Sequence, residues 1–194
     1  MNILFLGPDK QPQISIINFL LNEENIVNKY EDRFDVNLIE KNKYDFLISF
    51  GYRYIIGDEV LTFFKEKAIN LHISYLPWNR GSDPNLWSVL ENTPKGVTIH
   101  QLESGIDKGK ILYQKKVSFN NNDTLKTSYN KLMKQIVTLF KANWKNIKLK
   151  KVAMFEQEGP GTYHRSSDKK SYLHLLANGW DTQLKEIEGK ALHD

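Results

Sequence analysis

The chain has 194 residues, of which 40% are hydrophobic and 12% aromatic, and this composition excludes a disordered protein. The 27 Lys and Arg residues against 23 Asp and Glu residues give a formal net charge of +4, which is too small to indicate nucleic-acid binding. Zero cysteines exclude disulfides and thiolate metal sites, and apolar runs are too short to span a membrane. Met1 leads into a predicted strand rather than a signal peptide, so we expect a cytoplasmic protein.

The chain opens with a strand followed by a helix. Residues 2–6 are a short apolar run that predicts a buried parallel strand, and apolar residues at helical spacing follow over 14–21. This order is typical of a Rossmann-like α/β fold, with a mostly parallel sheet flanked by helices. The Gly-x-Gly-x-x-Gly motif is absent, so no dinucleotide cofactor is predicted. The turn at 7–10 is either a tight βα turn or a contact to a phosphate or sugar.

Three more strands are predicted before the middle of the chain, at residues 26–30, 35–39 and 45–50. The last is the strongest, because it is apolar almost throughout. Gly51 ends it, and a glycine at the carboxyl end of a parallel strand lets the chain turn into a ligand crevice. A helix is predicted over 58–65.

Polar residues interrupt the next strand, around residues 69–73. Asn70 and His72 are two residues apart and therefore project to the same face of that strand. Asp107 follows 35 residues after His72, in a Gly-Ile-Asp-Lys-Gly loop between predicted strands at 95–102 and 111–119. Taken alone, His72 is more often a hydrogen-bonded core histidine, and Asp107 an ordinary turn residue. Together they suggest that the loop returns the carboxylate to the imidazole.

The chemistry of these three side chains points to acyl transfer. An amide NH2 and an imidazole N–H aimed at one point stabilise an oxyanion. A carboxylate beside the imidazole favours its protonated, donating form. Because the chain has no cysteine and no Gly-x-Ser-x-Gly elbow, a covalent acyl-enzyme is not suggested, and direct transfer from donor to acceptor is.

The later chain contains a loop at 77–84, a short helix at 84–92 and a long helix that begins after Asp123 or Thr124. Residues 1–150 are expected to form one domain, on which an extension at 151–194 packs. We read His100 as a structural or partly exposed histidine. His164 has no second ligand at a suitable spacing, so no metal site is predicted.

Several ordered motifs resemble the folate-dependent formyltransferase family. They are Asn70-Leu71-His72-Ile73-Ser74-Tyr75-Leu76-Pro77, Arg80-Gly81, Pro84, Trp87, Gly96-Val97-Thr98-Ile99-His100 and Gly105-Ile106-Asp107-Lys108-Gly109. The resemblance implies that 10-formyltetrahydrofolate is the formyl donor and a primary amine the acceptor. It assigns catalysis to Asn70, His72 and Asp107. It assigns folate binding to a set of mainly apolar residues: Arg53, Tyr54, Ile55, Ile56 and Ile106.

Departures from the family narrow the expected acceptor. About 75 residues follow Phe119, too few for the C-terminal barrel with which methionyl-tRNA formyltransferases grip tRNA. The Gly-rich phosphate loop of glycinamide ribonucleotide enzymes is also missing after the first strand. The tail resembles those of short sugar N-formyltransferases, which implies a nucleotide-linked amino sugar of bacterial surface-polysaccharide synthesis. The expected substrate-binding residues are Arg80, Tyr163, His164 and Arg165.

Other functions stay open at this point. They are formylation of glycinamide ribonucleotide or another amine, hydrolysis of formyltetrahydrofolate, and folate binding without catalysis. A homodimer is expected because similar enzymes form homodimers.

Overall fold

A six-stranded mixed sheet forms the centre of the computed structural model, which describes residues 1–34 and 36–191. The strand order is β2-β1-β3-β4-β6-β7; the first four strands are parallel, and β6 runs antiparallel to both of its neighbours. This confirms the predicted α/β class. The bounds are β1 Asn2–Leu6, β2 Ile26–Tyr30, β3 Phe46–Ser49, β4 Ala68–His72, β6 Gly96–Gln101 and β7 Ile111–Lys116.

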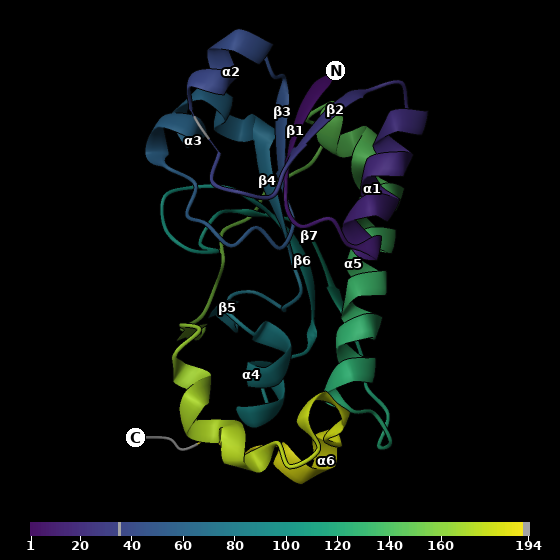
Figure 1. The fold of residues 1–194 in the computed structure, drawn as a ribbon, viewed down its shortest axis with the longest axis vertical. Coiled ribbons are helices and arrows are strands. Elements are labelled where there is room, and N and C mark those ends of the chain that lie inside the picture. Colours follow the sequence, from purple (N-terminus) through teal and green to yellow (C-terminus); the bar gives the residue numbers. More distant parts are fainter. Residues whose placement is uncertain (35, 192–194) are drawn as a thin grey trace.

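Helices cover both faces of the sheet (Figure 1). The long helices α1 (Gln11–Asn22) and α5 (Leu125–Lys148) lie on one face, and the short helices α2 (Asn37–Asn42) and α3 (Asp58–Phe64) lie on the other. Side chains of β1 alternate between these layers: Ile3 and Phe5 join the cluster with α1 and α5, and Leu4 and Leu6 join the cluster with α2 and α3. Because both faces are buried, the strand is apolar throughout.

The long helix α5 begins at a capping box. The Thr124 side chain accepts a hydrogen bond from the Thr127 backbone N–H, and the Thr127 hydroxyl accepts one from the Thr124 N–H, which satisfies two donors at the helix start. The buried stripe of α5 includes Leu132, Ile136, Phe140 and Trp144. Along this part of the helix, a buried side chain therefore recurs every four residues.

The predicted strand at residues 35–39 is wrong where the structure describes it. Residues 37–42 form helix α2, and Asp35 lies outside the described residues. The reason is topological. The strand before this segment, β2, pairs with one edge of β1, and the strand after it, β3, pairs with the other. A connection between parallel strands must cross over a face of the sheet, and a helix makes that crossing.

The extension after α5 packs on the end of the domain that carries α4 (Pro84–Leu90) (Figure 1). Strand β8 (Tyr163–His164) pairs in parallel with β5 (Arg80–Gly81). Helix α6 (Leu184–Ile187) buries both of its terminal residues in a cluster with α4 and Leu125. The 3-10 helices are η1 Lys65–Lys67, η2 Asp168–Leu175 and η3 Gly179–Asp181. No helix among the described residues is long and apolar enough to cross a membrane.

Candidate active site

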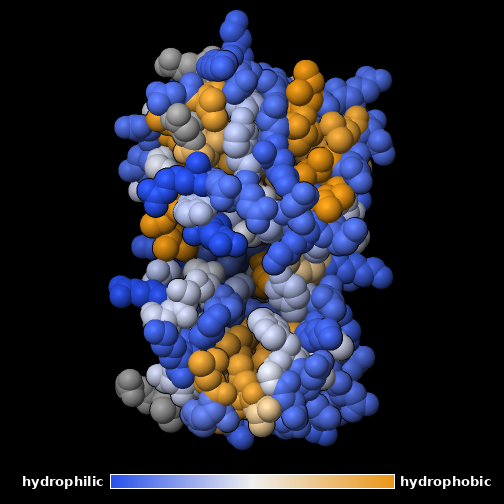
Figure 2. Space-filling model, in the orientation of Figure 1, coloured by the Kyte–Doolittle hydropathy of each residue, from blue (hydrophilic) through white to orange (hydrophobic). Residues whose placement is uncertain are grey.

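A cleft of about 720 Å³ opens at the carboxyl ends of β3 and β4. The space-filling view is hollowed near mid-height, between the part built on the sheet and the part built on α4 and the extension (Figure 2). Asn70, His72 and Asp107 all line this cleft, as does the loop at 51–56. The cleft thus lies at the carboxyl edge of the parallel strands, where ligands bind in open α/β sheets.

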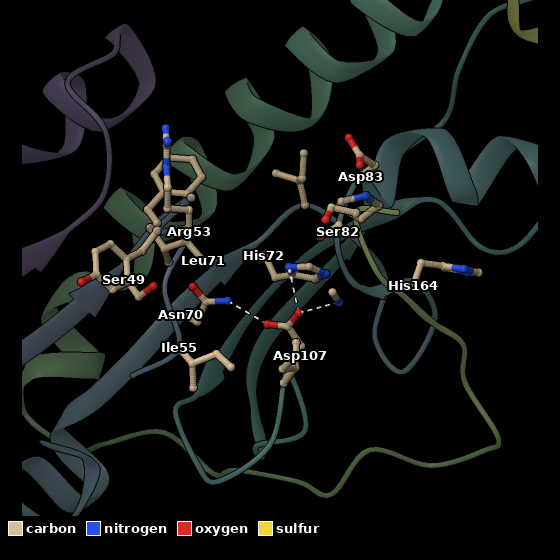
Figure 3. A pocket seen from close by; sticks show the side chains of 18 of the residues that line it. Ser49, Arg53, Ile55, Asn70, Leu71, His72, Ser82, Asp83, Asp107 and His164 are labelled. Atoms are coloured by element: carbon tan, nitrogen blue, oxygen red, sulfur yellow. Dashed lines mark hydrogen bonds and ion pairs between the residues drawn. The ribbon is translucent and has the colours of Figure 1, made fainter. Parts of the chain in front are cut away.

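Within the predicted trio, Asp107 is the residue that contacts both of the others (Figure 3). Its Oδ1 accepts a hydrogen bond from Asn70 Nδ2 at 3.1 Å, and its Oδ2 accepts one from the Gly81 backbone N–H at 2.8 Å. His72 Nδ1 lies 3.7 Å from the same Oδ2. The loop between β6 and β7 therefore brings the carboxylate back to β4, as the sequence predicts.

His72 is held in one orientation by its other ring nitrogen. Nε2 lies 3.0 Å from the backbone carbonyl oxygen of Asn79, which can only accept, so Nε2 carries a proton. Nδ1 is then the nitrogen that faces Asp107, and it donates only when the ring is protonated. Asn79 is itself fully buried, with hydrogen bonds to Thr93 and Thr162. The imidazole that faces the cleft is thus rigidly supported.

His100 contacts two residues of this trio, whereas the sequence predicts a structural or partly exposed histidine. It is 1% exposed, and its Nε2 lies 3.3 Å from Asp107 Oδ1 and 3.2 Å from Asn70 Nδ2. Its Nδ1 donates to the Gln101 carbonyl oxygen at 2.8 Å. Antiparallel pairing of β4 with β6 sets His100 directly opposite Asn70. Sequence spacing carries no signal of that register, which is why the residue was missed.

These contacts set the charge of Asp107. Burial by itself raises the pKa of the carboxyl, but His72, His100 and the Gly81 N–H outweigh it and hold the pKa well below its ordinary range. The carboxylate is therefore ionised at neutral pH and is a weak base. Its side chain is only 11% exposed, so water screens these interactions little.

The residues expected to bind folate line one end of the cleft. Ile55 is 86% exposed and Ile106 is 39% exposed, so both offer apolar surface to a ligand. Tyr54 stacks edge-on against Tyr52, whose hydroxyl donates to the Asp32 carbonyl oxygen and anchors the loop. The turn at 7–10 contributes no residue to the cleft lining, which favours its reading as a βα turn. The predicted folate-binding residues in the lining are Arg53, Tyr54, Ile55, Ile56 and Ile106.

The opposite end of the cleft is built from α4, β8 and η3. Tyr163 and Trp180 line it and are about half exposed. His164 also lines it, with its ring stacked on Trp87 at 3.7 Å between centroids. Its Nε2 lies 2.9 Å from Glu91 Oε1, without the geometry of a hydrogen bond.

Two of the predicted substrate-binding residues are placed differently. The Arg80 guanidinium is bonded to Gln157 and does not line the cleft. Arg165 is exposed, and its backbone N–H donates to Asp168, also away from the lining. In the described part of the chain, no cluster of three His, Asp or Glu side chains has the arrangement of a metal site.

Comparisons with known proteins bear on the fold and the family of this chain. The crystal structure of the formyltransferase PseJ from Anoxybacillus kamchatkensis, in complex with UDP-4,6-dideoxy-4-formamido-L-AltNAc and tetrahydrofolate, is 47% identical with a TM-score of 0.94. The alignment covers 99% of this chain and 100% of the PseJ chain. A 4-N formyltransferase from Francisella tularensis shares the fold at 21% identity and a TM-score of 0.78, over 88% of this chain and 78% of that one.

Among curated relatives, the methionyl-tRNA formyltransferase of Prochlorococcus marinus is 33% identical over 80% of this chain. The bifunctional polymyxin resistance protein ArnA of Wigglesworthia glossinidia brevipalpis is 40% identical over 50% of it. The chain spans only 49% and 15% of the lengths of these two relatives. A family model described as formyl transferase matches residues 5–142. The chain therefore belongs to the formyl transferase family.

Proposed function

We propose that this protein transfers the formyl group of 10-formyltetrahydrofolate to the primary amine of a nucleotide-linked amino sugar. The observation that carries the proposal is the convergence of Asn70, His72 and Asp107 midway along one cleft. Apolar, exposed residues lie on one side of this trio, and aromatic residues of the extension lie on the other. The cleft thus offers separate places for a donor and an acceptor.

The folate end has the chemistry that a pterin and its glutamate tail require. Ile55, Ile56 and Ile106 supply apolar contact, and the Tyr54 ring supplies an aromatic face. Arg53 lines the cleft at this end, and its guanidinium suits a carboxylate of the tail. The Gly51 backbone adopts φ of +70°, which carries the loop away from β3 and over the cleft.

The trio supplies the chemistry of transfer. The donor brings a formyl carbon bound to nitrogen, and that carbon–nitrogen bond breaks as the acceptor amine bonds to the carbon. The Asn70 Nδ2 hydrogen that is not donated to Asp107, and the Nδ1–H of protonated His72, which at 3.7 Å is not hydrogen-bonded to Asp107, donate to the formyl oxygen as it gains negative charge. The proton lost by the amine passes through water to the departing nitrogen, with the Asp107 carboxylate as the relay. Because the pKa of Asp107 is held low, its main role is to orient His72.

The acceptor end fits a nucleotide-linked sugar. Trp180 and Tyr129 are edge-on neighbours, 6.0 Å between ring centroids, and both line the cleft beyond the trio. An exposed indole of this kind stacks on a nucleobase. The 47% identity with PseJ over 99% of this chain and 100% of that one supports a UDP-linked amino sugar as the acceptor. Surface-polysaccharide synthesis is the role that the resemblance to short sugar N-formyltransferases implies.

The test is mass spectrometry of acceptor candidates incubated with the protein and 10-formyltetrahydrofolate. The set contains UDP-linked and dTDP-linked amino sugars, glycinamide ribonucleotide and a reaction without any amine. We expect one formyl group on one nucleotide sugar, abolished in His72→Ala. Formylation of glycinamide ribonucleotide alone would contradict the sugar assignment. Formate release without an amine would indicate a hydrolase, and folate binding without any product would contradict transfer to these acceptors.

A homodimer and a cytoplasmic location are further parts of this proposal. The resemblance to folate-dependent formyltransferases favours a homodimer, and the absence of cysteine is compatible with the cytoplasm. Light scattering during size-exclusion chromatography distinguishes a mass of 22.7 kDa from twice that value.

A further inference from the structure

Gln157 links the extension to the backbone that carries Asp107. Its Nε2 donates to the carbonyl oxygens of Asp107 and Gly109, both at 2.8 Å. Its Oε1 accepts from Arg80 Nε at 3.1 Å and from Arg80 Nη2 at 2.7 Å. Both amide hydrogens and the amide oxygen are therefore used, and all of their partners surround one catalytic loop.

The amide of Gln157 has one possible orientation. Arg80 offers only donors, and the two carbonyl oxygens offer only acceptors. Rotating the amide by 180° would place its N–H donors against the Arg80 donors and its oxygen against the carbonyl oxygens. This sets Gln157 apart from a surface glutamine that water satisfies in any rotamer. The side chain is thus matched to its surroundings at every polar atom.

The loop needs such support because of its backbone. Asp107 adopts φ of +52°, in the left-handed region that a non-glycine residue occupies only when its surroundings hold it there. Gln157 bonds to the carbonyl oxygen of this same residue. On the other side, the Gly81 N–H bonds to the Asp107 carboxylate, and Gly81 adjoins Arg80 in β5. These contacts form a closed ring that includes the carboxylate. Arg80 bonds to Gln157, and Gln157 bonds to Asp107. The Asp107 carboxylate bonds to Gly81, which is adjacent to Arg80 in the chain.

We propose that Gln157 is a positioning residue for formyl transfer, which fixes the Asp107 loop so that the carboxylate orients His72 and Asn70. This inference rests on the proposed function. It also assigns a role to a part of the chain beyond residue 142, where the family match ends. Arg80 then acts through Gln157 and β5 rather than by binding the phosphate of the acceptor.

Two variants of Gln157 test the proposal. Gln157→Met removes every polar contact, whereas Gln157→Glu keeps an acceptor for Arg80 and replaces both donors to the loop by an acceptor. The matched controls are Gln135→Met and Gln135→Glu, because the Gln135 amide oxygen accepts from Lys115 on the surface away from the cleft. The acceptor is the UDP-linked 4-amino sugar that corresponds to the formamido product bound in PseJ.

We expect kcat to fall roughly tenfold to a hundredfold in both Gln157 variants, as for a catalytic group misplaced by about 1 Å. KM for the sugar and Kd for tetrahydrofolate should stay within about threefold, because neither subsite is altered. Both Gln135 controls should keep the wild-type kcat. A kcat within threefold of wild type, or a raised KM with unchanged kcat, would overturn the positioning role.

A second readout does not need an acceptor. The Gly81 amide is protected by the Asp107 carboxylate, so its hydrogen exchange, followed by NMR, should quicken in Gln157→Glu even though Arg80 keeps a partner. Unchanged Gly81 exchange in both variants would overturn the proposal. If the wild-type protein formylates none of the nucleotide sugars, the proposed function fails, while this measurement still decides whether Gln157 holds the loop.

Discussion

His100 and Asp107 form a buried contact in the candidate active site, with Nε2 of the imidazole 3.3 Å from Oδ1 of the carboxylate. The other imidazole nitrogen is bonded to the Gln101 carbonyl oxygen, which fixes the ring. The Asp107 carboxylate therefore faces His72 with Oδ2 and contacts a second histidine, His100, with Oδ1.

Loss of His100 should change the protonation of Asp107. In His100→Leu, both the hydrogen bond and the charge interaction by which His100 lowers the pKa of Asp107 are removed, so this pKa should rise toward its ordinary value. Carboxyl 13C NMR between pH 2 and 6 measures it. Turnover should fall roughly tenfold, since a hydrogen bond to a charged group is worth about 1.5 kcal/mol. The exposed His174→Leu is the control, and an Asp107 titration that does not move would contradict the assignment.

Asn70→Ala should remove one donor to the developing oxyanion. The expected loss is about 3 kcal/mol of transition-state stabilisation, a hundredfold or more in kcat, with folding retained. The control is Asn146→Ala, an exposed position on α5. A folded Asn70→Ala enzyme with the wild-type rate would remove this residue from the mechanism.

Asp107 should make stability depend on pH in a defined direction. Its pKa in the folded protein lies below the value of about 3.9 in an unfolded chain, so the carboxylate stabilises the fold above pH 4, and this contribution is lost as the pH falls through the folded pKa. The difference in unfolding free energy between wild type and Asp107→Asn should therefore shrink by about 2 kcal/mol between pH 5 and pH 2. Urea titrations at each pH measure it. A difference independent of pH would show that the buried contacts do not lower this pKa.

Trp180→Ala should weaken binding of the acceptor sugar without affecting binding of folate. Stacking of a base on an aromatic side chain is worth about 1–3 kcal/mol, which predicts a KM for the nucleotide sugar raised roughly fivefold to a hundredfold. Kd for tetrahydrofolate, measured by calorimetry, should not change. Leu173→Ala, in the same extension and equally exposed at 52%, is the control. Equal loss of sugar and folate binding would point instead to a general collapse of the cleft.

The sequence by itself determined the class of fold and the grouping of Asn70, His72 and Asp107. Buried strands are apolar over a few consecutive residues, and the period-two geometry of a strand places Asn70 and His72 on one face without any long-range information. The loop that carries Asp107 was also readable, because predicted strands flank it and its Gly-Ile-Asp-Lys-Gly composition is that of a turn. These features depend on neighbours in the chain.

Only the tertiary structure decided what surrounds the trio. The register that sets His100 opposite Asn70 depends on the pairing of β4 with β6, and the helix at residues 37–42 depends on the crossing from β2 to β3. The turn of Arg80 away from the cleft depends on Gln157, 77 residues later. Contacts of this kind join segments far apart in the chain, and local periodicity and turn chemistry do not encode which distant partner a side chain meets.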